Sequence, residues 1–449
     1  MRGASSPLWV CLLLAGSVVV PGPISAQQPD ILLIQTDDQP WHTLPQMPNV
    51  QRLIGDQGAR FDGYYINTSL CAPSRVTTLL GQYSHHTGIL VNANSAKKFL
   101  PKSAKSLPVW LRSAGYRTAF VGKWLNDYGK KDSGWPAAPA GWDVWRGGDG
   151  GYYNYRLSID GVIEIHGSTP IDYSTRVLRD YAIEALNSAP TDVPLFLLFS
   201  PYAPHAPMTP DPVDVNAFNG VPWGISFLPN YNEANVSDKP AWVRALPLVK
   251  DQKMRQQHEN QLEALQAVDR AVADILAAAE ARGRLLYVFY VSDNGWTLGA
   301  HRWFRKWCAY DECSKGPFLV RGPGITAGVV IDNTKLVSNV DLAPTIAALA
   351  GATPNTTVDG LNLLPLLQDP TFEWKREVLL EDRGSPSSKL MRFWSIRSHD
   401  GWEWTEYDNG DRELYDMTAD AFQLESRHND PALADLRADL AARLAALRQ

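Results

Sequence analysis

Short, continuous apolar runs alternate along the chain with longer segments of helical periodicity. Four of these runs are typical of strands buried on both faces: residues 30–35, 116–121, 194–200 and 285–291. Apolar residues at helical spacing predict helices over residues 107–115, 172–187, 256–282 and 341–350. This alternation predicts an α/β fold whose buried parallel strands are connected by helices.

The pattern changes after residues 361–367, which we expect to close the main domain. Beyond them the apolar residues fall into short hairpin strands: residues 393–397, 401–404 and 413–416. An Ala-, Leu- and Arg-rich helix is expected over residues 431–447. The chain is therefore predicted to comprise a main domain at 27–367 and a smaller C-terminal α+β subdomain at 368–449 with a short antiparallel sheet.

Residues 1–26 have the features of a secretory signal peptide. Arg2 precedes an apolar run from Leu8 to Val20, and Ile24-Ser25-Ala26 is a suitable cleavage site. A membrane anchor is the alternative, but the run is shorter than the ~20 apolar residues that a spanning helix needs. We therefore expect an exported protein without stable membrane insertion, either secreted or in a periplasmic or lysosomal type of compartment.

Composition excludes some classes of function. The chain is 45% hydrophobic and 20% charged, which is ordinary for a folded globular protein and excludes a mostly disordered chain. Its net charge of −6 makes a basic nucleic-acid-binding surface unlikely as the main function, so no nucleic-acid partner is expected.

The cysteines point to one residue with a chemical role. Of four cysteines, Cys11 would leave with the signal peptide, so three remain in the mature chain. Cys308 and Cys313 are close enough for a local disulfide, although geometry could forbid it. Cys71 is then left over, which predicts an unpaired or modified cysteine.

Acidic residues follow two of the predicted strands. Thr36-Asp37-Asp38 ends the first and Ser292-Asp293-Asn294-Gly295 ends the last. Because ligands bind at the carboxyl ends of strands in such sheets, we expect these side chains to converge. Three carboxylates and one amide oxygen suit Ca²⁺ or Mg²⁺ better than zinc. For the Asp37-Asp38 pair alone, a surface turn is the alternative.

A Cys-x-Pro-x-Arg segment, Cys71 to Arg75, runs into a helix-like stretch. Ser69 is expected to cap this helix, and Pro73 suits its first turn. Cys71 would then lie where free backbone N–H groups and the helix dipole meet an anion. The segment therefore predicts a nucleophile site for an anionic ester.

Further candidate residues lie in loops after strands. Lys123 follows the strand at 116–121, and prolines hold His205 in the irregular loop at 201–207. Taken singly, a surface lysine and an unremarkable loop histidine are the alternatives. The segment at 126–167 is rich in Gly, Trp and Tyr and predicts loops and a hairpin. Its rings could form a carbohydrate-facing wall or pack in the core.

The Cys71–Arg75 segment resembles the signature of the type I sulfatases, in which this cysteine is oxidised to formylglycine, an aldehyde that works as its hydrate. The resemblance covers nearly all of the mature chain and extends to these stretches: Thr36-Asp37-Asp38, Gly122-Lys123-Trp124, Pro204-His205, Ser292 to Gly295, and His301 with Lys306 ahead of Arg321 to Gly324. In detail it is closest to the N-acetylglucosamine-6-sulfatase group, through residues 122–129, 152–155 and 203–210. The resemblance implies an alkaline-phosphatase-like fold with a large mixed, mostly parallel sheet.

The resemblance also implies a set of site residues. Those expected to act in catalysis are Cys71, Arg75, Lys123, His205 and Lys306, and those expected to hold the metal are Asp37, Asp38, Cys71, Asp293 and Asn294. The expected cofactors are Ca²⁺, with Mg²⁺ as the alternative, and formylglycine made from Cys71 by a formylglycine-generating enzyme.

The chain departs from the family pattern in two places. Leu125 stands where many sulfatases carry a histidine, and Asn126 is a candidate to substitute for it in part. His301 is present where the glucosamine group does not always have it. Asn126 and His301 are therefore candidate substrate contacts.

The expected function is hydrolysis of a sulfate monoester, with a carbohydrate sulfate such as N-acetylglucosamine 6-sulfate in a glycosaminoglycan as the favoured substrate. An arylsulfatase of broad specificity is one alternative. A phosphonate or phosphate monoester hydrolase is another, because the same cysteine turn and metal would serve either anion. A non-catalytic glycan-binding protein on this fold is the least favoured alternative.

Overall fold

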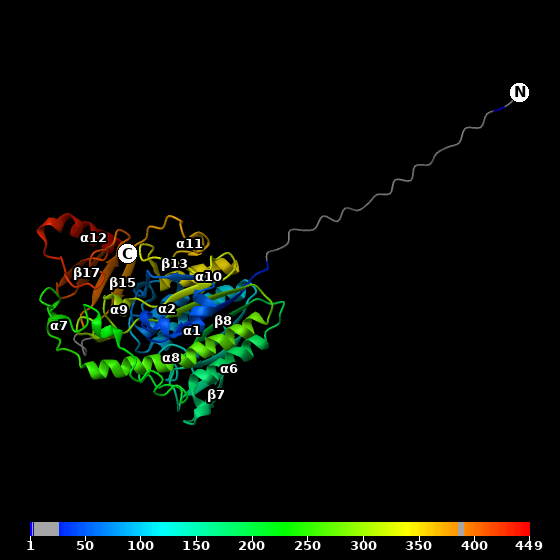
Figure 1. The fold of residues 1–449 in the computed structure, drawn as a ribbon. Helices are drawn as coiled ribbons and strands as arrows, with labels where there is room; N and C mark the ends of the chain where they lie inside the picture. The colour runs from blue at the N-terminus through cyan, green and yellow to red at the C-terminus, as the bar shows by residue number, and fades with distance from the viewer. Residues whose placement is uncertain (2, 4–26, 385–389) are drawn as a thin grey trace.

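The computed structural model describes residues 1, 3, 27–384 and 390–449 (Figure 1). The predicted signal peptide lies almost wholly outside the described residues. Within the described part, no helix has the length and apolar character needed to cross a membrane.

The centre of the molecule is a ten-stranded sheet in the order β13-β2-β12-β9-β1-β8-β4-β5-β6-β7. Its five middle strands are parallel: β9 (Leu286–Ser292), β1 (Asp30–Thr36), β8 (Leu195–Ser200), β4 (Arg117–Lys123) and β5 (Val144–Gly148). Antiparallel pairs occur among the outer strands: β12 (Phe318–Arg321), β2 (Ala59–Phe61), β13 (Val329–Ile331), β6 (Arg156–Ile159) and β7 (Val162–Ile165). The predicted large mixed, mostly parallel sheet is confirmed.

Helices cover both faces of this sheet. One face packs against α6 (Ser174–Asn187) and the long α8 (Asp251–Glu280), which lie side by side in Figure 1. The other packs against α2 (Cys71–Leu80), α5 (Leu107–Ser113) and α10 (Leu342–Ala350). In β1, Leu32 and Ile34 belong to the first core and Ile31 and Leu33 to the second, so the strand is apolar at successive positions because both of its faces are buried.

The remaining elements are short. The helices among them are α1 (Pro48–Val50), α3 (Ser84–Thr87), α4 (Ser95–Phe99), α7 (Ala241–Arg244), α9 (Asp311–Ser314) and α11 (Leu364–Gln368), and the strands are β3 (Tyr64–Tyr65), β10 (Thr297–Leu298), β11 (Phe304–Arg305) and β14 (Val337–Ser338).

The aromatic segment at 126–167 turns its rings inward. Trp142, Trp145, Tyr152 and Tyr155 are buried, and Phe120 of β4 stacks on Trp145 with ring centroids 4.7 Å apart. Core packing is therefore the correct interpretation for these four rings, and a sugar-facing wall is not.

The C-terminal region contains a four-stranded antiparallel sheet, as predicted. Its strands are β15 (Val378–Asp382), β16 (Phe393–Arg397), β17 (Trp402–Tyr407) and β18 (Arg412–Asp416), and α12 (Ala434–Leu447) packs on the sheet. The Tyr310 hydroxyl donates to Glu413 Oε1 at 2.8 Å, and Arg397 pairs with Asp311 at 3.2 Å. Buried polar contacts thus join this sheet to the loops of the main sheet.

Candidate active site

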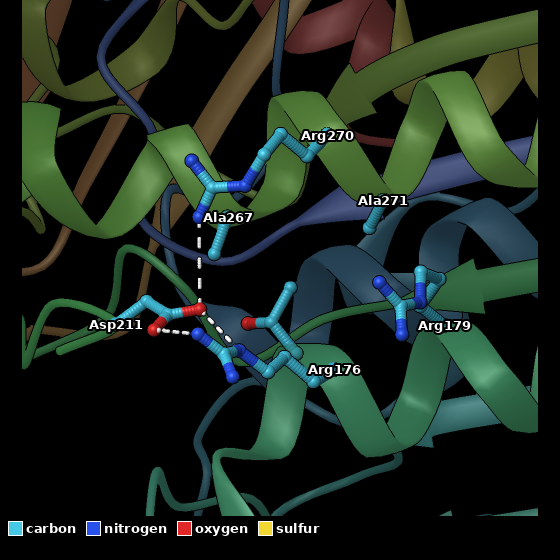
Figure 2. A pocket seen from close by; sticks show the side chains of 7 residues that line it. Arg176, Arg179, Asp211, Ala267, Arg270 and Ala271 are labelled. Atoms are coloured by element: carbon cyan, nitrogen blue, oxygen red, sulfur yellow. Dashed lines mark hydrogen bonds and ion pairs between the residues drawn. The ribbon is translucent and has the colours of Figure 1, made fainter. Parts of the chain in front are cut away.

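A cavity of about 250 Å³ lies between α6 and α8 and is lined by three arginines (Figure 2). Each guanidinium faces a carboxylate: Arg176 pairs with Asp211 at 2.5 Å, Arg270 with Asp214 at 2.6 Å and Arg179 with Asp274 at 3.3 Å. Arg176 and Arg270 therefore join the helices to the loop at 211–214, and Arg179 joins α6 to α8. The reactive groups converge elsewhere, at the carboxyl ends of the parallel strands.

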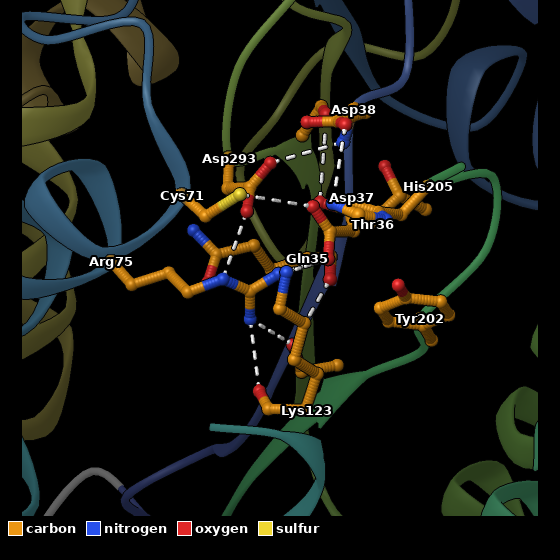
Figure 3. Close-up of polar contacts among 12 residues, drawn as sticks. Gln35, Thr36, Asp37, Asp38, Cys71, Arg75, Lys123, Tyr202, His205 and Asp293 are labelled. Carbon is orange, nitrogen blue, oxygen red and sulfur yellow. Dashed lines mark hydrogen bonds and ion pairs between the residues drawn. The ribbon is translucent and has the colours of Figure 1, made fainter. Parts of the chain in front are cut away.

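The acidic residues that follow β1 and β9 meet as expected, because the two strands are parallel neighbours in register from Asp30 to Thr36. The Asp38 backbone N–H donates to Asp293 Oδ1 at 3.1 Å, and Asn294 Nδ2 donates to Asp38 Oδ1 at 2.6 Å. Asp37, Asp38, Asp293 and Asn294 are all fully buried. Figure 3 shows the carboxylates of Asp37, Asp38 and Asp293 turned toward one another.

Cys71 faces this acidic group from the first residue of α2. Its Sγ lies 3.5 Å from Asp37 Oδ1 and 2.9 Å from Lys306 Nζ. Burial and the Asp37 carboxylate raise the pKa of Cys71 to about 12, although Lys123 and Lys306 oppose the shift. The protein groups around Cys71 therefore favour the thiol over the thiolate.

The prediction that Ser69 caps this helix is wrong. Leu70 occupies the cap position and makes no side-chain capping hydrogen bond, while the Ser69 hydroxyl donates to the Cys308 carbonyl at 3.5 Å. The helix begins at Cys71 itself, so Ser69 lies one residue outside the position from which a side chain reaches the free N–H groups.

Arg75 connects α2 to three strand ends. Its Nε donates to Asp293 Oδ2 at 2.8 Å, and its Nη1 donates to the Lys123 carbonyl at 2.9 Å and to Ser200 Oγ at 2.5 Å. Sequence reasoning missed Ser200, although its place at the end of β8 is the same signal that identified Asp37. The result is a guanidinium that holds the Cys71 helix against the sheet.

Two lysines neutralise the carboxylates. Lys123, the last residue of β4, pairs with Asp37, and Lys306 donates to Asp38 Oδ1 at 2.5 Å. Burial alone would lower the pKa of each ammonium, but the adjacent carboxylates raise both above the usual range. Both side chains are therefore charged.

His205 presents one ring nitrogen to the centre. Its Nδ1 lies 2.7 Å from the Ala206 carbonyl, so Nδ1 carries the proton, and Nε2 lies 3.7 Å from Asp38 Oδ2. Burial lowers the pKa of His205, outweighing the opposite effect of Asp37 and Asp38. The Tyr202 ring packs on the imidazole with centroids 4.7 Å apart.

The two candidate substrate contacts lie in different surroundings. His301 is fully buried, its Nδ1 lies 2.7 Å from Glu233 Oε2, and its ring stacks on Tyr310. Among the described residues it makes no hydrogen bond or ion pair with the acidic group, and its buried Nε2 has no hydrogen-bond partner, so its role as a substrate contact stays a prediction. Asn126 is half-buried, three residues after Lys123, and its Oδ1 has no hydrogen-bond partner in the described part of the chain.

The donor set fits a hard divalent cation. One ligand-type atom from each of Asp37, Asp38, Cys71 and His205 lies within 4.8 Å of the others. Asp38 Oδ2 is buried and accepts no hydrogen bond from the described residues, and an unpaired buried carboxylate oxygen is costly. Two of these four donors, those of Asp37 and Asp38, are carboxylate oxygens, which suit Ca²⁺ or Mg²⁺. His205 was not predicted as a ligand.

The charges of the centre are balanced without an ion. Three carboxylates, of Asp37, Asp38 and Asp293, stand against the three cationic groups of Arg75, Lys123 and Lys306. A divalent cation would leave the group with a net charge of about +2, which attracts an anionic ester. The arrangement thus suits an anion as substrate.

Cys308 and Cys313 form a disulfide with Cα atoms 5.6 Å apart, and Cys71 is the free cysteine among the described residues. The disulfide closes the loop that follows Lys306. The Trp303 indole donates to the Lys306 carbonyl at 2.9 Å, which fixes the same loop from its other side.

Residues 29–352 match the model of the family described as Sulfatase, and residues 299–449 match the model described as N-sulphoglucosamine sulphohydrolase, C-terminal.

Two curated relatives are similar over most of the chain. Human N-acetylglucosamine-6-sulfatase is 34% identical over an alignment of 403 positions, which covers 84% of this chain and 72% of that protein. An arylsulfatase of Chlamydomonas reinhardtii is 30% identical over an alignment of 505 positions, which covers 97% of this chain and 76% of that protein.

A solved structure described as a complex with its substrate D-glucosamine-2-N,6-O-disulfate superposes with a TM-score of 0.77. The superposition covers 93% of this chain and 97% of the other at 23% identity. A likeness at this identity shows a shared fold.

Proposed function

Because the chain belongs to the sulfatase family and is therefore a sulfuric ester hydrolase, we propose that it acts through a formylglycine hydrate made from Cys71 and a bound divalent cation. One observation carries the proposal: Cys71 is buried at the start of α2, with its Sγ 3.5 Å from Asp37 Oδ1 and 2.9 Å from Lys306 Nζ. A reactive group made from Cys71 would therefore face both the carboxylates and a cationic side chain.

The chain's own residues have distinct roles in this proposal. Asp37, Asp38, Asp293 and Asn294 would hold the cation. When bound, the cation would supply Lewis-acid stabilisation and the aldehyde hydrate an attacking hydroxyl. Lys123 and Lys306 hold the sulfate oxygens as charge moves onto them.

Arg75 and His205 complete the centre. Arg75 keeps the start of α2 aligned with the sheet through Asp293 and Ser200. His205 Nε2 is free to accept a proton and to return it to the leaving oxygen, since Nδ1 is engaged by the Ala206 carbonyl.

For the substrate we favour a carbohydrate sulfate such as N-acetylglucosamine 6-sulfate in a glycosaminoglycan. The names of the human relative and of the ligand in the solved structure support this class. A broad arylsulfatase is the second candidate, because the algal arylsulfatase is similar over more of the chain. The ratio of kcat/KM for N-acetylglucosamine 6-sulfate to that for an aryl sulfate separates the two.

Maturation would involve export and a formylglycine-generating enzyme, with Ca²⁺ favoured as the ion and Mg²⁺ as the alternative. The decisive experiment is mass spectrometry of the tryptic peptide from Phe61 to Arg75, combined with activity on an aryl sulfate. We expect the aldehyde form in active protein and no activity in Cys71→Ala. An unmodified thiol in fully active protein, or a higher kcat/KM for a matched aryl phosphate, would overturn the proposal.

A further inference from the structure

Asp149 lies beside the strand end that carries Lys123 and does not belong to the proposed catalytic or metal-binding group. Strands β4 and β5 are parallel and in register, with Lys123 opposite Gly148, and the Trp124 N–H donates to the Gly148 carbonyl at 2.8 Å. Asp149 is the next residue and leaves the sheet at the same edge. Unlike the carboxylates of the centre, it is exposed.

The Asp149 carboxylate is only partly engaged. Its Oδ1 accepts a hydrogen bond from the Asp127 backbone N–H at 3.1 Å, and among the described residues Oδ2 accepts none and no cation pairs with the group. Its partly enclosed surroundings raise the pKa of Asp149, although the Lys123 charge opposes this. Lys123 pairs with Asp37 and makes no ion pair with Asp149. The Oδ2 atom thus remains available for hydrogen-bond donors.

The Asp149 loop is built against the loop that carries His205. At Gly150, where φ is +103°, an added Cβ would lie 2.4 Å from Tyr202 Cδ2, so the backbone passes directly over the Tyr202 ring. The same ring contacts two residues of the centre: the His205 imidazole, with ring centroids 4.7 Å apart, and the Lys123 ammonium, 5.4 Å from its centroid (Figure 3). The Tyr152 hydroxyl also donates to the His205 carbonyl at 2.8 Å.

Asp149 therefore lies at the same edge of the sheet as Lys123, and the next residue, Gly150, packs on the Tyr202 ring that contacts His205. In an ester whose sulfate lies between Lys123 and Lys306, the group that carries the sulfate would lie near this edge. A free carboxylate there attracts hydroxyl or amide N–H groups and repels a second anionic group.

We propose that Asp149 is a specificity residue: its Oδ2 accepts a hydrogen bond from a hydroxyl or amide N–H of the sugar unit that bears the sulfate ester, and its charge disfavours sugars with a second sulfate or a carboxylate on that side. This inference rests on the proposed function, because it assumes a sugar sulfate as substrate. It adds a preferred substrate class, the neutral monosulfated sugar.

The test compares Asp149→Ala and Asp149→Asn on three substrates: N-acetylglucosamine 6-sulfate, glucosamine 2-N,6-O-disulfate and an aryl sulfate without sugar hydroxyls. Loss of a hydrogen bond to a charged group predicts that Asp149→Ala lowers kcat/KM for the monosulfated sugar roughly tenfold to a hundredfold. Activity on the aryl sulfate should stay within about twofold of the wild type. Asp149→Asn should raise the ratio of disulfated to monosulfated kcat/KM several-fold.

Asp180→Asn is the matched control for a change in net charge, because Asp180 is an exposed carboxylate on α6. A parallel loss on all three substrates would show a merely structural role, and unchanged ratios in both Asp149 variants would overturn the inference. If the wild type is fully active and its Cys71 is converted, either of these two results would leave the proposed function intact. A wild type inactive on every sulfate ester would instead overturn the proposed function.

Discussion

Lys306 both balances a buried charge and contacts the residue proposed to react. Its ammonium contacts both Asp38 and Cys71, so it balances a buried carboxylate and faces the reacting group at once. Lys306→Met keeps most of the side-chain volume and removes the charge. We expect kcat/KM for an aryl sulfate to fall roughly a hundredfold or more, as when a donor to developing negative charge is removed.

The control for this change is Lys97→Met, since Lys97 forms an exposed ion pair with Asp132 at 3.3 Å. Such pairs contribute little, so its kcat/KM should remain near the wild-type value. Conversion of Cys71 must be equal in both variants by mass spectrometry. Near-normal activity in Lys306→Met would remove Lys306 from the proposed catalytic group.

His205 leads to a prediction about pH. Since burial lowers its pKa below the usual 6.5, the imidazole stays neutral at neutral pH, with Nε2 able to accept a proton. Activity that depends on the neutral form should persist as the pH falls to 6.5 and decline only below it. The profile of kcat/KM against pH checks this, and His205→Asn should lower kcat roughly a hundredfold or more. A decline that sets in well above pH 6.5 would contradict the prediction.

For individual residues, the sequence alone could predict those whose position follows from a strand end or from a local motif. Asp37, Asp38, Asp293 and Asn294 converge because parallel neighbouring strands end at one edge. His301 could not be understood in this way. Its partner Glu233 lies 68 residues away in the irregular segment before α7, and only the folded chain shows that the two are packed together.

At the scale of secondary-structure elements, strands β4 and β8 leave no room for a side chain at Gly122. Its φ is +132°, and a Cβ there would lie 1.9 Å from the Ser200 carbonyl oxygen. Gly122→Ala must therefore separate the strands next to both Lys123 and Ser200. We expect the free energy of unfolding to fall by at least about 2 kcal/mol, measured by urea denaturation, with loss of activity.

Gly224→Ala is the matched control, because the position of its added Cβ has no heavy atom within 4 Å. Its unfolding midpoint should stay near that of the wild type. Equal stability of the Gly122 and Gly224 variants would mean that the strand contact is not as close as described.

The loop with the Cys308–Cys313 disulfide is the element that positions Lys306. Closing so short a loop is expected to contribute about 2 kcal/mol to stability through the unfolded state. Cys308→Ser/Cys313→Ser should therefore lower the melting temperature and, by loosening the loop after Lys306, reduce kcat as well. Calorimetry and kinetics on the double variant check both, and unchanged kcat would separate the disulfide from the position of Lys306.

Element boundaries show where sequence patterns lose information. Helix α8 begins at Asp251, five residues before the predicted start, because its first turns bury only Met254 and so lack an apolar stripe. The aromatic segment at 126–167 left two interpretations open, because an aromatic ring can pack against a sugar or against another ring. Only the fold places Trp145 against Phe120.

For the molecule as a whole, one sheet brings the site together and the C-terminal strands attach to its loops. The family models overlap between residues 299 and 352, where the main sheet and the later segment share loops. The division at residue 367 therefore stays a prediction. Glu413 illustrates the coupling, since it accepts hydrogen bonds from Tyr310 of the main body and from Tyr407 and Tyr415 of its own sheet.

Global stability should depend on pH through two half-buried histidines that lie next to each other in the lining of one cavity. His42 and His258 have ring centroids 5.7 Å apart, and burial lowers their pKa values to about 3 and about 4. Both are neutral in the folded protein near pH 5, whereas the unfolded chain protonates them below about 6.5. The unfolded state then binds more protons, so stability is lost as the pH falls from about 6.5 toward 4, by up to about 1.4 kcal/mol per pH unit for each histidine.

The variant His42→Gln/His258→Gln should therefore lose less stability than the wild type between pH 7.5 and pH 5, measured as free energies of unfolding in urea. His86 provides a control of opposite sign. Burial alone would lower its pKa, but the hydrogen bond to Asp359 at 2.8 Å raises it, so His86→Gln should steepen the loss of stability on acidification. If all three proteins lose stability in parallel, carboxylates rather than these histidines govern the acid response.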